Sequence, residues 1–268
     1  MPFFAANLSM LYPEHDFLKR FEAARNDGFT AVEYLFPYAH TAQEIKQLLD
    51  EQQLKQVLFN APPGDWDNGE RGMACHPGRS QEFQDSIGKA LEYAKVLDCS
   101  QVHVMAGLKP QGVGQELLDK TYIENLTYAA QEAAKVNVDI LIEPINTRDM
   151  PGFYLNYQEQ AHQIVQAVGL KNLKVQMDLY HCQIMEGDLS KKIEHYLPTG
   201  RVGHIQIAGV PTRNEPTIGE LHYPYLFNLI DKLGFQGHIG CEYKPLRGAE
   251  PNGTSIGLDW LKNYQASQ

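Results

Sequence analysis

Short runs rich in β-branched and aromatic residues alternate with amphipathic stretches from one end of the chain to the other. Continuous apolar runs of this kind are typical of strands that are buried on both faces of a parallel sheet. We predict strands over residues 3–7, 31–36, 54–60, 101–107, 138–144, 173–180, 202–209 and 238–244. Apolar residues at helical spacing predict helices over 16–27, 41–52, 81–97, 121–136, 158–168, 188–196 and 223–233, with a last segment over 255–264.

Eight strand–helix units in 268 residues match the size of a (β/α)₈ TIM barrel. We predict this α/β fold as a single domain over residues 1–268, since no linker rich in Pro, Ser or Gly divides the chain. A doubly wound open sheet shows the same alternation, but it usually carries a glycine-rich phosphate loop after its first strand. This chain has ANLSMLYPE there. The longest irregular stretch, residues 60–80, is interpreted as a lid over the catalytic face.

Four side chains with oxygen atoms lie near the ends of the last four predicted strands: Glu143, Asp178, Gln206 and Glu242. In a barrel these strand ends converge on one site. A nearly all-oxygen set suits a hard divalent cation, Mg²⁺ or Mn²⁺, better than a thiolate-rich zinc site. One such residue would be read as a polar cap or a solvent-facing group. Four on successive strands favour a metal site.

Other polar residues near the same barrel mouth are candidates for binding a substrate. His181 follows the sixth strand and could contact a substrate hydroxyl, act as an extra ligand, or be structural. His103, in the fourth strand, could point into the barrel or belong to the core. Three cations could hold a substrate carboxylate, with arginine favoured by its bidentate geometry: Arg71, Arg213 and Lys244.

Composition excludes several other classes of protein. The formal net charge is −10 and no block of Lys and Arg occurs, which argues against a nucleic-acid partner. The N-terminus lacks a signal peptide and no run approaches a membrane span, so we expect a cytoplasmic protein without a membrane partner. The four cysteines show no CxxC spacing and are expected to be buried free thiols. The sequence leaves a homo-oligomer open.

Nucleophile and nucleotide motifs are missing, because there is no GxSxG elbow, Walker loop or dinucleotide loop. What remains is a cation flanked by Glu143 and Glu242 on the fifth and eighth strands, which are not adjacent in a closed barrel. Their carboxylates could approach a substrate from different sides. We expect proton transfer next to a carbonyl that the metal polarises, with one Glu removing the proton and the same or the other Glu returning it.

Several segments resemble the hydroxypyruvate isomerase family, which includes the 2-oxo-tetronate isomerases and belongs to the xylose-isomerase-like TIM barrels. They include GDWDNGERG, IEPINTRDMPGF, MDLYHCQIMEGDL, GHIQIAGVPTRNEPTIGE and GCEYKP, and the resemblance runs from about residue 3 to 262. It implies that Glu143 and Glu242 transfer the proton and that Glu143, Asp178, Gln206 and Glu242 hold the metal. Similarity to related sugar epimerases implies that His181 and Arg213 contact the substrate. Many of those relatives carry His where this chain has Gln206, and the Gln matches the hydroxypyruvate isomerase branch.

We therefore expect an isomerase of a small oxo hydroxy acid substrate. The reaction would be hydroxypyruvate to tartronate semialdehyde, or its four-carbon version, 2-oxo-tetronate to 3-oxo-tetronate. A free-sugar 3-epimerase would use the same metal and glutamate pair without needing a cation for a carboxylate. An abasic-site endonuclease of the same barrel type would need more His ligands and a basic surface. A non-catalytic scaffold would leave the converging carboxylates unexplained.

Overall fold

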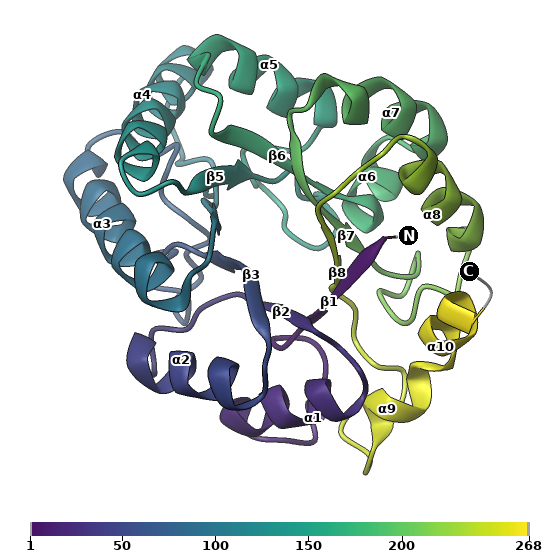
Figure 1. The fold of residues 1–268 in the computed structure, drawn as a ribbon. Coiled ribbons are helices and arrows are strands. Elements are labelled where there is room, and N and C mark those ends of the chain that lie inside the picture. Colours follow the sequence, from purple (N-terminus) through teal and green to yellow (C-terminus); the bar gives the residue numbers. More distant parts are fainter. Residues whose placement is uncertain (1, 267–268) are drawn as a thin grey trace.

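Eight parallel strands close into a barrel in the computed structural model, which describes residues 2–266 (Figure 1). Each strand pairs with its sequence neighbour, and β1 pairs with β8 to complete the ring. The predicted (β/α)₈ barrel is confirmed. The strands are β1 (Phe3–Asn7), β2 (Ala31–Tyr34), β3 (Lys55–Asn60), β4 (Gln101–His103), β5 (Asp139–Ile142), β6 (Leu173–Asp178), β7 (Val202–Ile207) and β8 (His238–Cys241).

Helices form the outer ring around these strands (Figure 1). Local signals set their ends: Thr41 and Glu44 form a reciprocal capping box at the start of the second helix, and Gly169 ends the fifth in the left-handed conformation. The helices are α1 (Arg20–Asn26), α2 (Ala42–Glu51), α3 (Ser80–Leu97), α4 (Gln115–Ala134), α5 (Gln158–Val168), α6 (Leu179–Met185), α7 (Leu189–Tyr196), α8 (Tyr223–Lys232), α9 (Gly253–Gly257) and α10 (Asp259–Ala266), with 3₁₀ turns η1 (Phe17–Lys19) and η2 (Leu197–Thr199).

Several predicted elements differ in extent from the observed ones, and the strand predicted over 101–107 already ends at His103. The strand predicted over 173–180 ends at Asp178, and α6 begins at the next residue because the Asp178 carboxylate accepts from the N–H groups of Tyr180 and His181. α4 begins at Gln115 instead of 121, and its first turn is mostly exposed, with only Leu118 buried. The segment predicted over 255–264 is two helices, α9 and α10.

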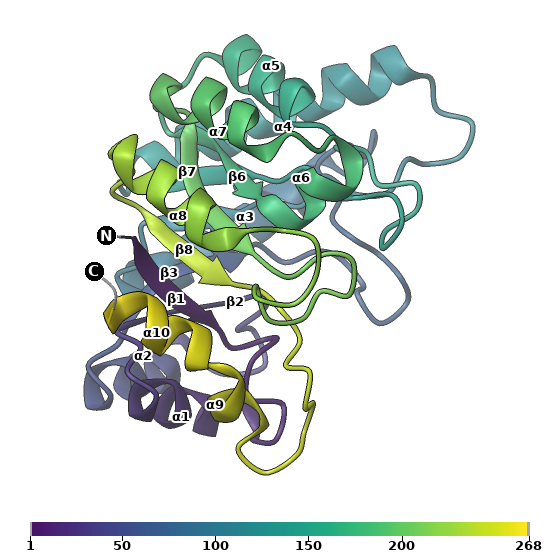
Figure 2. The ribbon, with the colours of Figure 1, turned by 90° about the vertical axis from the view of Figure 1, so that its right-hand side faces the viewer.

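The barrel interior is apolar in one part and polar in another. A small cluster separate from the main core packs on the strands: Ala5, Ala31, Val57, Leu58 and Leu141. Buried polar side chains also occupy the strands: Glu33, His103, Gln176, Asp178, His204 and Gln206. Buried polar groups need partners or a ligand, so they indicate where the function lies. Figure 2 shows the chain termini on one side of the barrel and the long loops on the opposite side.

The stretch over 60–80 is irregular, as predicted, but half of it is fixed to the barrel. Met73, Ala74 and Cys75 are buried, and the Cys75 N–H donates to the Ala106 carbonyl. Gly72 bridges to Ala106 with a φ of 103°, where an added Cβ would lie 2.3 Å from the Met105 carbonyl oxygen. This bridge fixes the middle of the stretch to the barrel, and the lid itself stays a prediction.

Two further observations bear on the composition. All four cysteines are free and buried, as predicted. Within residues 2–266, no helix combines the length and the apolar character that a membrane crossing requires. The cytoplasmic location stays a prediction.

Candidate active site

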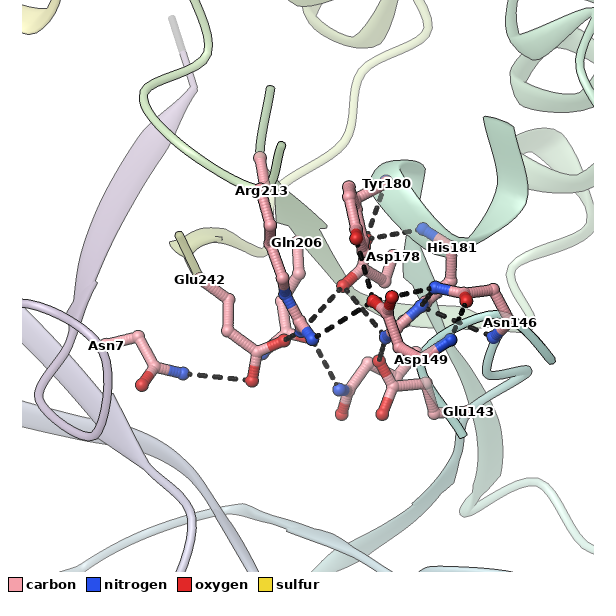
Figure 3. A network of polar contacts seen from close by, with 12 residues as sticks. Asn7, Glu143, Asn146, Asp149, Asp178, Tyr180, His181, Gln206, Arg213 and Glu242 are labelled. Atoms are coloured by element: carbon pink, nitrogen blue, oxygen red, sulfur yellow. Dashed lines mark hydrogen bonds and ion pairs between the residues drawn. The ribbon is translucent and has the colours of Figure 1, made fainter. Parts of the chain in front are cut away.

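The predicted strand-end residues meet at one end of the barrel (Figure 3). Asp178 ends β6, while Glu143 and Glu242 each follow the last residue of β5 and β8. Glu143, Asp178, His181 and Glu242 are all buried, and each offers one ligand atom, these atoms lying within 4.8 Å of one another. Side chains from three separate strands therefore converge on one small volume.

This cluster fits a divalent cation. Glu143 Oε1 and Asp178 Oδ2 are buried and have no hydrogen-bond partner. Such unsatisfied carboxylate oxygens are costly unless a cation neutralises them. The three carboxylates are also ligands that a hard divalent cation accepts. The cluster could hold a metal ion.

Burial perturbs the acidity of all three carboxyl groups. Burial raises the pKa of Glu143 well above its usual range, and the charges of Glu242 and Asp178 raise it further. Burial also raises the pKa of Glu242 to about 8, although Arg213 opposes the shift. The pKa of Asp178 is raised by burial as well, again against Arg213. Without a cation the cluster therefore retains protons near neutral pH, which allows it to contain an acid and a base together.

Arg213 supplies a positive charge next to these carboxylates. Its Nη2 donates to Glu242 Oε2 at 2.5 Å and lies 3.9 Å from Asp178 Oδ2, while its guanidinium sits 5.0 Å from the Tyr180 ring centroid. Its backbone has a φ of 58°, and the loop is held by the Lys244 N–H donating to the Arg213 carbonyl. Burial would lower the pKa of Arg213, but the neighbouring carboxylates outweigh it and the pKa is raised. The guanidinium therefore stays charged inside the site.

His181 is held as a neutral hydrogen-bond donor. Its Nδ1 accepts from the Asn146 backbone N–H at 3.3 Å and faces Asn146 Nδ2 at 2.6 Å. The proton therefore belongs on Nε2, which lies 3.8 Å from Asp178 Oδ2 and 4.0 Å from Glu143 Oε1. Burial, with Arg213, lowers the pKa of His181 well below its ordinary value. An Nε2–H aimed at the cluster favours donation to a substrate oxygen over metal ligation.

His103 also faces this volume. Its Nε2 lies 3.7 Å from Glu143 Oε2, and burial lowers its pKa to about 3, so the ring is neutral. Neither ring nitrogen has a hydrogen-bond partner. An unsatisfied imidazole beside a cavity is available to a ligand, in line with the inward orientation considered from the sequence.

Three members of the cluster, Glu143, His181 and Glu242, line a cavity of about 430 Å³. The other predicted cations, Arg71 and Lys244, line the same cavity together with Trp66. Arg71 lies 3.9 Å from the Trp66 ring centroid, and its Nη1 donates to the Trp66 and Glu70 carbonyls at 2.9 and 2.6 Å. Lys244 is exposed. All five predicted substrate-binding residues thus border one cavity, and Arg71 is held more firmly than Lys244.

The family model described as Xylose isomerase-like TIM barrel matches residues 21–264. The chain belongs to this family. Within it, a 2-oxo-tetronate isomerase of Cupriavidus necator is 56% identical over 264 residues, which is 98% of this chain and 99% of that protein. The hydroxypyruvate isomerase of Escherichia coli is 44% identical over 262 residues, again 98% and 99% of the two chains. The predicted family and the isomerase class are confirmed.

A solved structure gives the same fold under a different description. A crystal structure from Brucella melitensis, described as an AP endonuclease of family 2, is 47% identical to this chain. It superposes with a TM-score of 0.94 over 98% of this chain and 99% of that one. This chain and the Brucella protein therefore share the barrel closely. The Brucella structure is described as an endonuclease, whereas the two relatives above are named isomerases.

Gln206 differs from the other predicted metal ligands of this family member. Its Oε1 accepts from Gln176 Nε2 at 2.6 Å, and its Nε2 donates to Glu33 Oε1 at 2.7 Å. An amide oxygen has a second lone pair, so the first bond leaves it able to ligate. A direct contact between Gln206 and a metal stays a prediction.

Sequence analysis missed four residues that support the site: Asn7, Glu33, Asn146 and Gln176. Asn7 ends β1, and its Nδ2 lies 3.3 Å from Glu242 Oε1. The strand-end rule applied to the last four strands would have found Asn7. A charge inside the apolar run AVEYLF would have marked Glu33. Asn146 carries no comparable signal, because its role depends on contact with α6.

Proposed function

We propose that this protein interconverts the 2-oxo and 3-oxo forms of a small hydroxy acid with the help of a divalent cation, Mg²⁺ or Mn²⁺. The observation that carries the proposal is the meeting of Glu143, Asp178, His181 and Glu242 within 4.8 Å in a buried cluster. The substrate would be hydroxypyruvate, converted to tartronate semialdehyde, or 2-oxo-tetronate, converted to 3-oxo-tetronate. Relatives with these two names are 44% and 56% identical to the chain.

Glu143 and Glu242 are assigned the proton transfer. One of them, as the carboxylate, removes the hydrogen from the hydroxyl-bearing carbon next to the carbonyl, which leaves an enediolate. The same or the other Glu then delivers a proton to the former carbonyl carbon, while the hydroxyl hydrogen moves to the former carbonyl oxygen. A carboxylate that has taken up this proton is then an acid that can return it, so a single glutamate can both accept and donate the proton.

Two other residues would stabilise the charge that develops on the substrate oxygens. The Arg213 guanidinium is a fixed cation beside Glu242, and the His181 Nε2–H points at the same cluster. Donors fixed in a buried site stabilise an enediolate more than mobile water does. A bound divalent cation would polarise the substrate carbonyl, and Glu143, Asp178, Glu242 and, as predicted, Gln206 would hold it.

Arg71 is the best candidate for holding the substrate carboxylate. Arg213 is already engaged with Glu242, and Lys244 is exposed at the rim. The plane of Arg71 is set by stacking on Trp66 and by two backbone carbonyls. A guanidinium held in this way loses little freedom when it binds a carboxylate in a bidentate manner.

The four-carbon acid is the preferred substrate in this proposal. The more similar of the two relatives is the 2-oxo-tetronate isomerase, at 56% against 44% identity. Neither 2-oxo-tetronate nor hydroxypyruvate fills a cavity of about 430 Å³, so volume alone does not choose between them. Contacts to the terminal hydroxyl group of 2-oxo-tetronate would determine the preference between the two acids.

A second candidate, cleavage of abasic DNA, has one observation in its favour, the description of the Brucella structure. The chemistry of the site opposes it. Among residues 2–266, the cluster that could hold a metal contains one histidine and three carboxylates, and the net charge of the chain is −10. A DNA-binding surface needs clustered basic side chains. We therefore propose no nucleic-acid partner, and a free-sugar 3-epimerase is the closer rival because it needs the same glutamate pair.

NMR in D₂O tests the proposal. The protein is incubated with hydroxypyruvate, 2-oxo-tetronate or a free ketose, with Mn²⁺ or with chelator. We expect cation-dependent isomerisation of an acid with deuterium appearing at the carbon next to the carbonyl, and none with Glu143→Gln or Glu242→Gln. Glu159→Gln, an exposed change on α5, serves as the matched control. Turnover of the ketose alone would make the protein an epimerase. Cleavage of an abasic DNA oligonucleotide, incubated with the protein in a separate assay, would support the endonuclease.

A further inference from the structure

The amide of Gln206 is useful to a metal site in only one orientation. Its oxygen can ligate a cation, whereas its NH₂ group cannot. Gln206 is paired in register with Asp178 of β6 on one side and with Gly240 of β8 on the other, so its side chain starts beside a residue of the carboxylate cluster. The hydrogen-bond partners of Gln206 therefore set whether its amide oxygen or its NH₂ group faces the cation.

Gln176 contacts the oxygen end of the Gln206 amide. Its Nε2 donates to Gln206 Oε1 at 2.6 Å, while its own buried Oε1 has no hydrogen-bond partner. Burial raises the pKa of Glu143 and a side-chain hydrogen bond from Gln176 opposes this rise, so the Gln176 amide itself faces a carboxylate. Without carboxylates to hold them, two amides facing each other would leave both orientations open.

Glu33 removes the ambiguity because a carboxylate offers only acceptors. Its Oε1 accepts from Gln206 Nε2 at 2.7 Å and from Asn7 Nδ2 at 2.9 Å, and its Oε2 pairs with His204 Nε2 at 2.6 Å. The residue is 1% exposed. Since it lies inside the barrel, Glu33 cannot exchange these donors for water.

The barrel makes room for this carboxylate at one position. A Cβ added at Gly240 would lie 2.3 Å from both Glu33 oxygens and 2.5 Å from Glu33 Cδ. The three nearest atoms all belong to Glu33, so a side chain at position 240 would displace that carboxylate first. The lack of a side chain at Gly240 therefore leaves the space that the Glu33 carboxylate occupies.

We infer that Glu33, in the space left by Gly240, is a positioning residue that holds the Gln206 amide with its oxygen available to the divalent cation. The inference rests on the proposed metal site. The alternative is that Glu33 has a structural role only, as a buried charge that His204 neutralises. That alternative predicts an effect on folding, or a general electrostatic effect on the cation, but no dependence on Gln206.

A double-mutant cycle separates the two readings. Mn²⁺ dissociation constants are measured by calorimetry for the wild type, Glu33→Gln, Gln206→Ala and the double variant. We expect Glu33→Gln to weaken Mn²⁺ binding by about 10- to 100-fold, as for other partners that orient a ligand. In the Gln206→Ala background the same change should cost less than about threefold, because no amide remains to be oriented. An equal loss in both backgrounds would overturn the inference and leave Glu33 a general charge.

Gly240→Ala provides a second variant that keeps the charge of Glu33. It should weaken Mn²⁺ binding in the same Gln206-dependent way by displacing the carboxylate. Gly88→Ala is the matched control, because a Cβ at this exposed position of α3 meets nothing within 4 Å. If Glu33→Gln does not fold, Gly240→Ala carries the test. Unchanged Mn²⁺ affinity in both variants would overturn the inference alone, and a wild-type protein that binds no Mn²⁺ would overturn the metal site with it.

Discussion

Binding of Mn²⁺ to the metal-free protein is expected to release protons at neutral pH. The pKa of Glu242 is raised to about 8, chiefly by burial, and that of Glu143 is raised well above its ordinary value by burial and by Glu242 and Asp178. A cation binds carboxylates, so it must displace the protons that these groups retain. Measuring the displaced protons therefore reports the electrostatic state of the cluster directly.

The magnitude follows from the position of the pKa relative to the pH. A group with a pKa of about 8 is about 0.9 protonated at pH 7, so Glu242 alone contributes nearly one proton. The pKa of Glu143 is raised as well, so we expect a release of at least about one proton per Mn²⁺. The affinity for Mn²⁺ should accordingly rise as the pH increases towards 8.

Calorimetry in buffers with different enthalpies of ionisation measures this number. The slope of the observed binding enthalpy against the ionisation enthalpy of the buffer is negative, and its magnitude equals the number of protons released. Glu242→Gln should release about one proton fewer. Gln206→Ala is the control, since its amide does not titrate and the slope should persist despite weaker binding. A slope of zero at pH 7 for the wild type would refute the reasoning, because the carboxylates would then be ionised before the cation arrives.

Three further predictions concern catalysis, specificity and stability. Glu143→Gln should lower kcat by about 10²- to 10⁴-fold, measured by deuterium uptake, because the proton acceptor is lost. Arg71→Ala should raise KM for the oxo acid by about 10-fold or more with a smaller change in kcat, since a charge-assisted bond to the carboxylate is lost, and Lys244→Ala should have less effect. In chelator, the wild type should lose about 1.4 kcal/mol of stability between pH 7 and pH 9 relative to Glu242→Gln.

The sign of the stability change follows from the folded pKa of Glu242 being above its unfolded value. Stability from such a group is complete below the unfolded pKa and is lost as the pH rises through about 8. Denaturant titrations of both proteins give the difference, and a constant or growing advantage of the wild type would contradict it. For Arg71→Ala, a decrease in kcat without a rise in KM would contradict the role of Arg71 in binding the substrate carboxylate. For Glu143→Gln, retained deuterium uptake would assign the proton transfer elsewhere.

The barrel and the location of the candidate site could be predicted from local sequence patterns. Apolar runs and amphipathic stretches are local patterns, and eight of each leave few folds of this length. Because parallel strands end on the same side, Glu143, Asp178 and Glu242 could be placed together from their positions at strand ends alone. Sequence also indicated Arg213 and His181, which follow the neighbouring strands.

The hydrogen-bond partners and the protonation of these groups depend on the tertiary structure. Asn7 and Glu242 are 235 residues apart, and Glu33 and Gln206 are 173 apart, so closure of β1 onto β8 brings their contacts into being. Burial sets the pKa of Glu242, and no local pattern reports the depth of a side chain in a closed barrel. The strand ends are local, whereas hydrogen-bond partners and desolvation are properties of the closed barrel as a whole.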